Sequence, residues 1–224
     1  MKKIYITSDG FLGSYLKNHF KNNLTNNIEN ADIVINTVGI LKENKHTYEE
    51  SHVEFVKNLI PKVKDKKLIH ISALGSKKNH PSGYKHTKAL AEELIKQNVK
   101  NYAIIKPSII LGEGQKLYEE LEKFKNMPLI FAPKMKVQPI TIEKLTAFID
   151  RVIKDDLKGE FELCGEEVIS MKKLFLAVFQ RYGKNPIILE MPKAFFRIML
   201  PFLSVAGIMS KDEYLMIEDN ICKG

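Results

Sequence analysis

Residues 7–14, "TSDGFLGS", directly follow the short apolar run "KIYI" at residues 3–6. An apolar strand that ends in a glycine-containing turn and opens into a helix is typical of sites that hold a dinucleotide pyrophosphate. Gly10 and Gly13 are three residues apart, as in such a turn, but Thr7 stands where its first glycine belongs. Glycine there allows a tight turn, whereas a β-branched residue disfavours unusual backbone angles. The stretch predicts a strand, a turn and a helix, and the rest of the chain must show whether the turn serves a ligand.

Short apolar runs alternate with amphipathic stretches through the first half of the chain. We expect strands at residues 3–7, 32–38, 67–74 and 102–110, and helices at residues 13–22, 47–63 and 85–97. Strands that alternate with helices in this way favour a parallel sheet covered on both faces. The predicted fold class is α/β, a Rossmann-like doubly wound parallel sheet.

The pattern changes after residue 115. We expect helices at 116–126, 141–154 and 170–183 and a strand at 159–165, while three prolines in 127–140 exclude a long regular element there. An apolar tail follows at 194–209. The predicted organisation is a dinucleotide-binding domain at 1–112 and a small α/β substrate or partner lobe at 113–224, packed together as one compact unit.

Composition narrows the function classes. The 224 residues carry a net charge of +8, but the basic residues are 32 lysines and only 3 arginines, spread along the chain. Scattered lysines indicate a solvated surface, since arginine is the residue that clamps phosphates and reads guanine, so nucleic-acid binding rests on the charge balance alone. Cys164 and Cys222 have no metal-ligand spacing, and we expect neither a disulfide framework, nor a metal site, nor a membrane span or signal peptide. A reducing cytoplasm is the expected location.

Three polar side chains suggest chemistry. Ser72 ends the strand "LIHIS", and Tyr84 and Lys88 lie four residues apart in the helix "GYKHTKALAEE". Residues at i and i+4 share a helix face, so a lysine ammonium beside the phenol is expected to lower the tyrosine pKa and make it a general acid or base. The Ser72 hydroxyl, at a strand end of the same cleft, is suited to hold a carbonyl. The alternative is an ordinary solvated helix face.

The order of these motifs resembles the atypical and extended short-chain dehydrogenases/reductases, a group like the NAD-dependent epimerases and dehydratases. Within it, the chain is most similar to the branch of the NAD(P)H-binding accessory subunit of respiratory complex I. The resemblance rests on "DIVINTVGIL", "HVEFVKNLI", "LIHISALG", "SGYKHTKALAEE", "AIIKPSIILGEG", "QPITIEKLTAFI", "GEFELCGEEVISMKKL" and "DEYLMIEDN". It implies an NAD or NADP cofactor.

The resemblance also implies roles for residues. Tyr84 and Lys88 would be the catalytic pair, with Lys88 also bonded to the nicotinamide ribose, and Ser72 would orient the carbonyl. The cofactor would face the first turn, the end of the second strand and the end of the fourth: Thr7, Ser8, Gly10, Phe11, Leu12, Gly13, Thr37, Val38, Gly39, Pro107, Ser108 and Ile109.

The chain departs from this family after Gly13. Only residues 14–31 separate Gly13 from Asp32, whereas the family places a helix, a ribose-reading strand, another helix and a third strand there. A ten-residue helix spans about 15 Å and uses most of the interval. At most a stub of strand remains, near "NLTNN". Asp32 precedes its strand, so we reject it as the ribose acid, and the sequence does not separate NAD from NADP.

Two functions follow. The first is an NAD(P)H-binding oxidoreductase with Tyr-Lys-Ser chemistry on a carbonyl or hydroxyl of a small molecule. The second is a non-catalytic accessory or assembly protein of a respiratory or quinone-related membrane system, which would be cytoplasmic and peripheral to the inner membrane. The apolar tail at 194–209 has two interpretations. It is either part of an ordinary core or a surface that contacts a membrane or a protein partner.

Overall fold

The structure, a computed structural model, describes residues 2–223 and divides into two compact units. Unit 1 runs to Pro107 and takes in Ile142–Leu163, and unit 2 consists of Ser108–Thr141 and the chain from Cys164 onward. This division differs from the single boundary expected at residue 112. Residues 142–163 fold with the first unit because their strand pairs with its sheet.

Unit 1 is built on five parallel strands in the order β1-β2-β3-β4-β9. The strands are β1 (Ile4–Ile6), β2 (Ile33–Asn36), β3 (Lys67–Ile71), β4 (Tyr102–Pro107) and β9 (Gly159–Leu163). Their centres are runs of Ile, Val and Leu, which suits a sheet buried on both faces. The predicted α/β fold with a parallel sheet is confirmed.

The strand order never reverses, because the segment between α1 and β2 is short. After α1 (Phe11–His19), the chain makes only one bridge to the sheet, between Leu24 and Ile4, and a 3-10 turn at Ile28–Asn30 before it enters β2. Leu24 is the stub of strand expected near "NLTNN". Apart from the Leu24 bridge, β1 is therefore the edge strand of the sheet.

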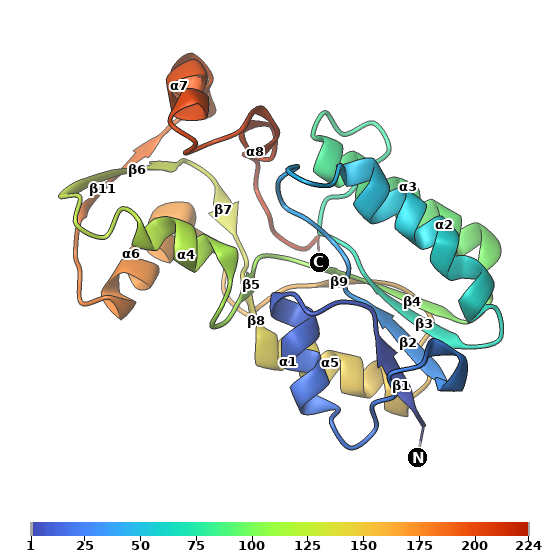
Figure 1. The fold of residues 1–224 in the computed structure, drawn as a ribbon. Helices are drawn as coiled ribbons and strands as arrows, with labels where there is room; N and C mark the ends of the chain where they lie inside the picture. The colour runs from blue at the N-terminus through green and yellow to red at the C-terminus, as the bar shows by residue number, and fades with distance from the viewer. Residues whose placement is uncertain (1, 224) are drawn as a thin grey trace. The chain divides into compact units, whose positions relative to one another are not determined.

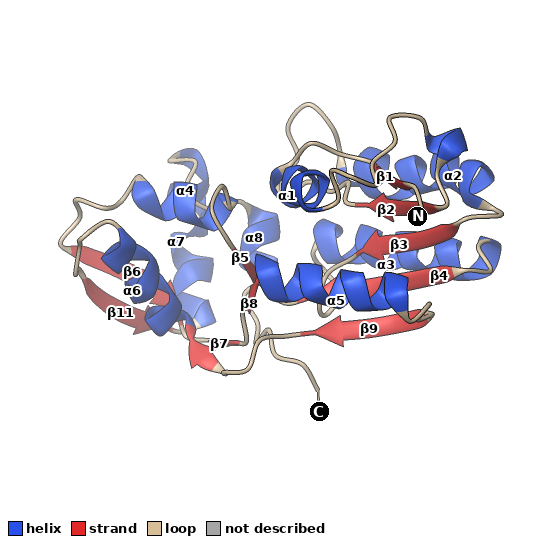
Figure 2. Ribbon diagram, turned by 90° about the horizontal axis from the view of Figure 1, so that it is seen from below, coloured by secondary structure: helices blue, strands red, loops and turns tan. Residues whose placement is uncertain are grey.

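Helices cover both faces of the sheet, α1 and α5 (Ile142–Lys154) on one face and α2 (Phe55–Leu59) and α3 (Gly83–Asn98) on the other (Figure 2). A π-helical segment, η2 (Glu49–Glu54), precedes α2, and a 3-10 turn, η3 (Ile60–Val63), follows it. The side of the sheet beneath α2 and α3 is an apolar core formed by Ala31, Val34, Val56, Leu59, Ile60, Val63, Leu68, Ala91, Ile95, Val99 and Ile104. Burial of these side chains fixes α3, which carries Tyr84 and Lys88, against the sheet.

Unit 2 contains short strands and four helices among its described residues. The strands are β5 (Ile110–Leu111), β6 (Leu129–Pro133), β7 (Lys136–Val137), β8 (Ile140–Thr141), β10 (Ile169–Ser170) and β11 (Ile187–Met191). The helices are α4 (Lys116–Glu122), α6 (Met171–Arg181), α7 (Lys193–Val205) and α8 (Lys211–Leu215). A core of Leu121, Ile130, Ala132, Val137, Met171, Leu174, Val178, Phe179 and Ile188 joins α6 to the β6–β11 pair. None of the helices among residues 2–223 has the length and apolarity needed to cross a membrane.

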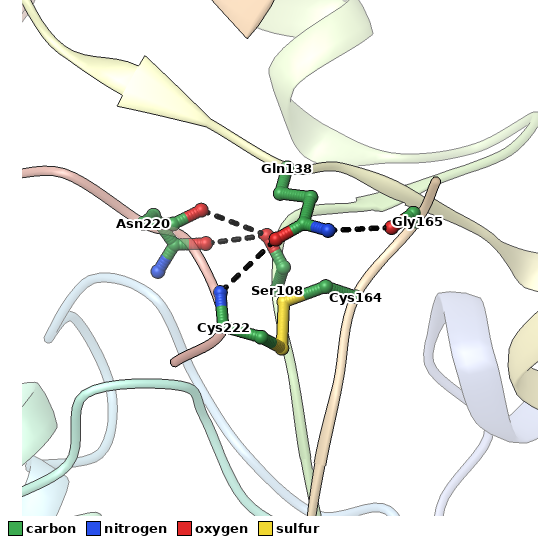
Figure 3. The surroundings of a disulfide bond; sticks show 6 residues. All are labelled: Ser108, Gln138, Cys164, Gly165, Asn220 and Cys222. Atoms are coloured by element: carbon green, nitrogen blue, oxygen red, sulfur yellow. Dashed lines mark hydrogen bonds between the residues drawn. A yellow bond between two sulfur atoms is a disulfide. The ribbon is translucent and has the colours of Figure 1, made fainter. Parts of the chain in front are cut away.

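The two cysteines form a disulfide within unit 2, so the expectation that the chain has no disulfide framework is wrong. Cys164 and Cys222 are 58 residues apart in sequence, yet their Cα atoms lie 6.0 Å from each other. Gln138 connects the backbone segments that carry the two cysteines. Its carboxamide donates to the Gly165 carbonyl and accepts from the Cys222 N–H (Figure 3). A spacing rule can find metal ligands close in sequence, but only the tertiary fold brings distant cysteines within bonding reach.

Candidate functional site

The carboxyl ends of β1 and β2 are tied together by side-chain hydroxyls. Thr7 donates to the Asn36 carboxamide oxygen at 3.0 Å and accepts from the Thr37 N–H at 3.1 Å, and the Ser8 and Thr37 hydroxyls are 2.8 Å apart. Thr7 also keeps an ordinary backbone, because Asp156 is the one non-glycine residue with positive φ in the described part of the chain. Threonine therefore joins two strand ends here, and the turn has no need of a glycine at this position.

The turn into α1 leaves the helix N-terminus open. Gly10 is the N-cap residue, no side chain caps the helix, and its first turn carries no acidic residue. Gly13 is required by close packing, since a Cβ there would lie 2.1 Å from the Ser8 carbonyl oxygen. Uncapped N–H groups and the positive end of a helix form an anion site, and this close approach places them directly over the end of β1.

Tyr84 and Lys88 lie one turn apart on α3, as their spacing predicts. Lys88 is 4% exposed, and its ammonium donates to the Val38 carbonyl at 3.3 Å and to the Ile71 carbonyl at 3.1 Å. A Cβ on Gly39 would lie 2.9 Å from the Lys88 Nζ atom. The lysine therefore connects α3 to the ends of β2 and β3. Two of the residues that it contacts, Val38 and Gly39, are among those expected to line the cofactor cleft.

Burial sets the protonation states of this pair. Loss of solvent raises the pKa of Tyr84 to about 12, so the prediction that Lys88 would lower it is wrong. The ammonium is directed to the two backbone carbonyls, and burial lowers the pKa of Lys88 to about 8, against the opposing attraction of Glu92. At neutral pH, Tyr84 holds its proton and Lys88 holds its charge. Tyr84 therefore carries the proton that a general acid needs, although burial makes its phenol a weaker acid than tyrosine in water.

An aromatic cluster that the sequence analysis did not assign to the site surrounds Tyr84. The Tyr84 ring lies 5.5 Å from the His52 ring and 6.0 Å from the Tyr48 ring, measured between centroids. His52 comes from η2, and π-helical turns are frequent at functional sites. Its Nε2 accepts from the Ile40 N–H at 3.3 Å, so Nδ1 carries the proton and donates to the Thr87 hydroxyl at 2.8 Å. Thr87 is three residues after Tyr84 and lies on the same side of α3. A polar residue at this spacing is the sequence signal that could have indicated a buried partner such as His52.

A second buried histidine lies at the end of β3. The Asn36 oxygen accepts from Thr7 and from the Val38 N–H, so its Nδ2 donates to the His70 Nδ1 atom at 3.0 Å. His70 Nε2 then carries a proton, and this buried atom has no partner within residues 2–223. Burial lowers the pKa of His70 well below its usual value and that of His52 to about 2, with the Lys88 charge adding to both shifts. Both histidines are neutral at physiological pH.

This pair predicts that the protein loses stability in mild acid. The unfolded histidines protonate near their usual pKa of 6.5, whereas the folded ones do not, so their contribution is complete above pH 6.5 and is lost as the pH falls below it. Between pH 7.5 and pH 5.5 we expect each histidine to remove about 1.4 kcal/mol from the free energy of unfolding. Urea titrations at several pH values measure this slope.

Two variants test the assignment. His52→Gln should remove about half of the pH slope, because one of the two buried rings is gone. His46→Gln should leave it unchanged, since the His46 side chain is 72% exposed. An unchanged slope in His52→Gln would contradict a neutral buried imidazole at this position.

Ser72 is buried at the end of β3, and its hydroxyl donates to the Glu92 carboxylate of α3. Glu92 also pairs with Lys106 at 2.8 Å, and Lys106 pairs with Glu160 at 2.6 Å. This ion network, which runs from the buried Glu92 to the exposed Glu160, was missed from the sequence because its members come from three separate elements. The structure thus gives Ser72 a carboxylate partner on α3, the helix that also carries Tyr84 and Lys88.

The remaining predicted residues divide between the units. Phe11 and Leu12 form the first turn of α1, and the Pro107 carbonyl accepts from the Leu74 N–H at 3.0 Å in unit 1. Ser108 and Ile109 belong to unit 2, where the Ser108 hydroxyl donates to the Asn220 side chain at 2.6 Å (Figure 3). The predicted residues at the ends of β1 and β2 and on α1 and α3 therefore lie together in unit 1. Ser108 instead makes its hydrogen bond within unit 2.

The gathered residues fit one half of a dinucleotide. The open N-terminus of α1 suits a pyrophosphate, and the third N–H of the Lys88 ammonium is left for a ribose hydroxyl by the two carbonyls it contacts. The adenosine half fits less well. Within residues 2–223, only the single Leu24 bridge lies outside β1, so no second strand end is present there to read a ribose.

Comparison with known proteins agrees with this geometry. Residues 34–154 match an NAD-binding family described as "Male sterility protein". The chain is 27% identical over 150 residues to the mitochondrial NADH dehydrogenase (ubiquinone) 1 alpha subcomplex subunit 9 of Dictyostelium discoideum, covering 64% of this chain and 42% of that protein. It spans less than half the length of the mitochondrial relatives that it matches.

Solved structures share the fold. A dTDP-4-dehydrorhamnose reductase from Clostridium acetobutylicum superposes with a TM-score of 0.74 at 16% identity, over 96% of this chain and 97% of that one. The same enzyme from Bacillus anthracis, solved in complex with NADP, gives the same TM-score, identity and coverage. At this identity, the similarity establishes the fold and leaves the substrate open.

Proposed function

The chain belongs to the NAD-binding family described as "Male sterility protein", and from this premise we propose that it is an NAD(P)H-dependent oxidoreductase acting on a carbonyl or hydroxyl group. The proposal covers the activity of the whole protein. The proposed substrate is a small molecule that carries this carbonyl or hydroxyl group.

One observation carries the proposal, the placement of the Lys88 ammonium. It is buried at the meeting point of α3 and the ends of β2 and β3, one helical turn from Tyr84. Burying a lysine is costly, and its lowered pKa records that cost. A solvated helix face would not hold a lysine in this way, whereas a site that binds a ribose and steers a proton needs one.

In this proposal the bound nicotinamide supplies hydride chemistry. Tyr84 gives its proton to the carbonyl oxygen, with the Lys88 ammonium one helical turn away on the same helix. Ser72 orients the carbonyl, which requires its hydroxyl to turn away from Glu92. Thr7 to Gly13 face the pyrophosphate, Thr37 to Gly39 line the cleft, and Pro107, Ser108 and Ile109 remain assigned to the nicotinamide by resemblance alone.

Titration with NADH and with NADPH, followed by nicotinamide fluorescence, tests cofactor binding. We expect saturable binding in the micromolar range for at least one of the two. Lys88→Met should weaken it about tenfold, because a charged donor to the ribose is lost. Lys62→Gln, on the exposed surface of unit 1, is the control and should bind like the wild type. If neither nucleotide binds at high micromolar concentration, the proposed function is wrong.

A second candidate is a non-catalytic accessory or assembly protein of a respiratory membrane system. Two observations favour it: Ser72 is already bonded to Glu92, and the sheet is shortened on the adenosine side. The names of the mitochondrial relatives support the same idea. Binding of NADPH without turnover of any aldehyde, ketone or quinone would select this candidate.

The partner in either case is proposed to meet residues 194–209. These residues include most of α7, and we propose that the protein works in the cytoplasm, peripheral to the inner membrane.

A further inference from the structure

Unit 2 exposes an unusual amount of apolar surface on one side. Ile187 is 66% exposed, Ile198 71%, Phe202 70% and Val205 92%. Single exposed apolar residues are common, but a continuous group of large ones marks an interaction surface.

The first part of this surface is one face of the β6–β11 pair. The two strands are parallel, with Ile187 opposite Leu129 and Leu189 opposite Phe131, and all four side chains are exposed. The alternate residues turn to the other face, where Ile130 and Ile188 pack in the core against α6. The β6–β11 pair is thus apolar on both faces. The face with Ile130 and Ile188 packs in the core, and the face with Leu129, Phe131, Ile187 and Leu189 is exposed.

The second part is a stripe along α7. Phe195, Ile198, Phe202 and Val205 are spaced by three, four and three residues, so they share one face of the helix. The Phe195 ring lies 5.4 Å from the Phe131 ring, which joins the stripe to the face of the sheet. Figure 1 shows α7 on the side of β6 and β11 opposite to α6. We call the sheet face and the stripe together the apolar face.

The charges near α7 indicate what covers this face. Residues 192–211 contain Lys193, Arg197 and Lys211 and no aspartate or glutamate. Lys193 and Arg197 are exposed in the N-terminal half of α7 on the polar side of the helix, away from the stripe, and Lys193 also donates to the Leu215 carbonyl at 3.4 Å. An occupant must therefore offer an apolar interior and a negative surface together, which is the chemistry of a bilayer with anionic headgroups.

The dimensions of α7 fit the same occupant. Its 13 residues span about 20 Å, less than the hydrocarbon thickness of about 30 Å, so it suits lying in the interface plane with its apolar stripe inward. Phe and Ile side chains can enter the acyl boundary while the neighbouring cations stay among the headgroups.

We propose that unit 2 binds an anionic phospholipid surface through the apolar face and the cations Lys193 and Arg197. This inference is independent of the glycine turn, Tyr84 and Lys88, which belong to unit 1.

Flotation with lipid vesicles tests the proposal. We expect the protein to float with phosphatidylcholine vesicles that contain phosphatidylglycerol, and much less with phosphatidylcholine alone. The double variant Ile198→Ser/Phe202→Ser should lower the partition coefficient about tenfold or more, because two large side chains no longer enter the bilayer. Arg197→Gln should weaken binding to the anionic vesicles about fivefold. Val168→Ser, at a residue 49% exposed elsewhere in unit 2, should float like the wild type.

Folding and self-association are measured in parallel. Because the replaced side chains are exposed, the circular dichroism spectra and melting temperatures should match the wild type. Absence of flotation, or equal flotation of the double variant, would overturn the proposal. So would a concentration-dependent dimer, seen by light scattering, that the double variant abolishes while the wild type fails to float, since the face would then bind a second copy.

Discussion

Tyr84→Phe is expected to lower carbonyl reduction about a thousandfold while NADPH affinity stays within about twofold, because a positioned general acid contributes on the order of a hundred- to ten-thousandfold. The phenyl ring fills the same place between Tyr48 and His52, and only the proton donor is lost. The measurement is NADPH consumption with a panel of aldehydes, ketones and quinones, beside fluorescence titration of NADPH.

Tyr48→Phe provides the matched control. It removes a hydroxyl from the same aromatic cluster, one that donates to the Leu41 carbonyl at 2.9 Å. We expect its turnover to change by no more than a few-fold, since a single neutral hydrogen bond is worth about 1 kcal/mol. Equal turnover in Tyr84→Phe and the wild type would show that another group donates the proton.

The second large effect is expected at Gly13. Gly13→Ala should lower the free energy of unfolding by more than about 2 kcal/mol and abolish NADPH binding, because its Cβ would meet backbone atoms of Ser8 that have no room to move. The Cβ would lie 2.1 Å from the Ser8 oxygen and 2.8 Å from the Ser8 carbonyl carbon. Chemical denaturation measures the stability, and the same nucleotide titration measures the binding.

Gly10→Ala separates packing from ligand approach. A Cβ on Gly10 would find its nearest neighbour, the Ser8 hydroxyl, at 4.0 Å, and the Gly10 φ of −68° suits any residue. We therefore expect stability within about 0.5 kcal/mol of the wild type. NADPH binding should still weaken about tenfold, because a methyl group at the helix N-terminus obstructs a phosphate. If Gly13→Ala were as stable as Gly10→Ala, the close approach of α1 to Ser8 would be wrong.

Most elements could be predicted because their signals are local. Alternating apolar runs and amphipathic stretches place β1 to β4, and the β9 strand was expected at residues 159–165 and is found at Gly159–Leu163. The i, i+4 spacing of Tyr84 and Lys88 is a property of any helix, so their shared face followed from the sequence. The missing interval after Gly13 likewise predicted the shortened sheet, which the Leu24 bridge confirms.

What surrounds these residues could not be read in the same way. The direction of the Tyr84 pKa shift depends on how much solvent the fold removes, and burial raises this pKa instead of the lysine charge lowering it. His52, His70 and Glu92 joined the site through side-chain contacts made across 20 to 35 residues. Such contacts carry no periodic signal in the sequence.

The sequence by itself therefore determined the α/β class, the glycine turn and the Tyr84–Lys88 face, because periodicity and short spacings are set by the backbone geometry of strands and helices. Tertiary structure decided that Thr7 ties β1 to β2, that Ser72 meets Glu92, and that Cys164 reaches Cys222. The physical reason is that hydrogen bonding, desolvation and disulfide formation depend on distance in space, which the fold alone creates.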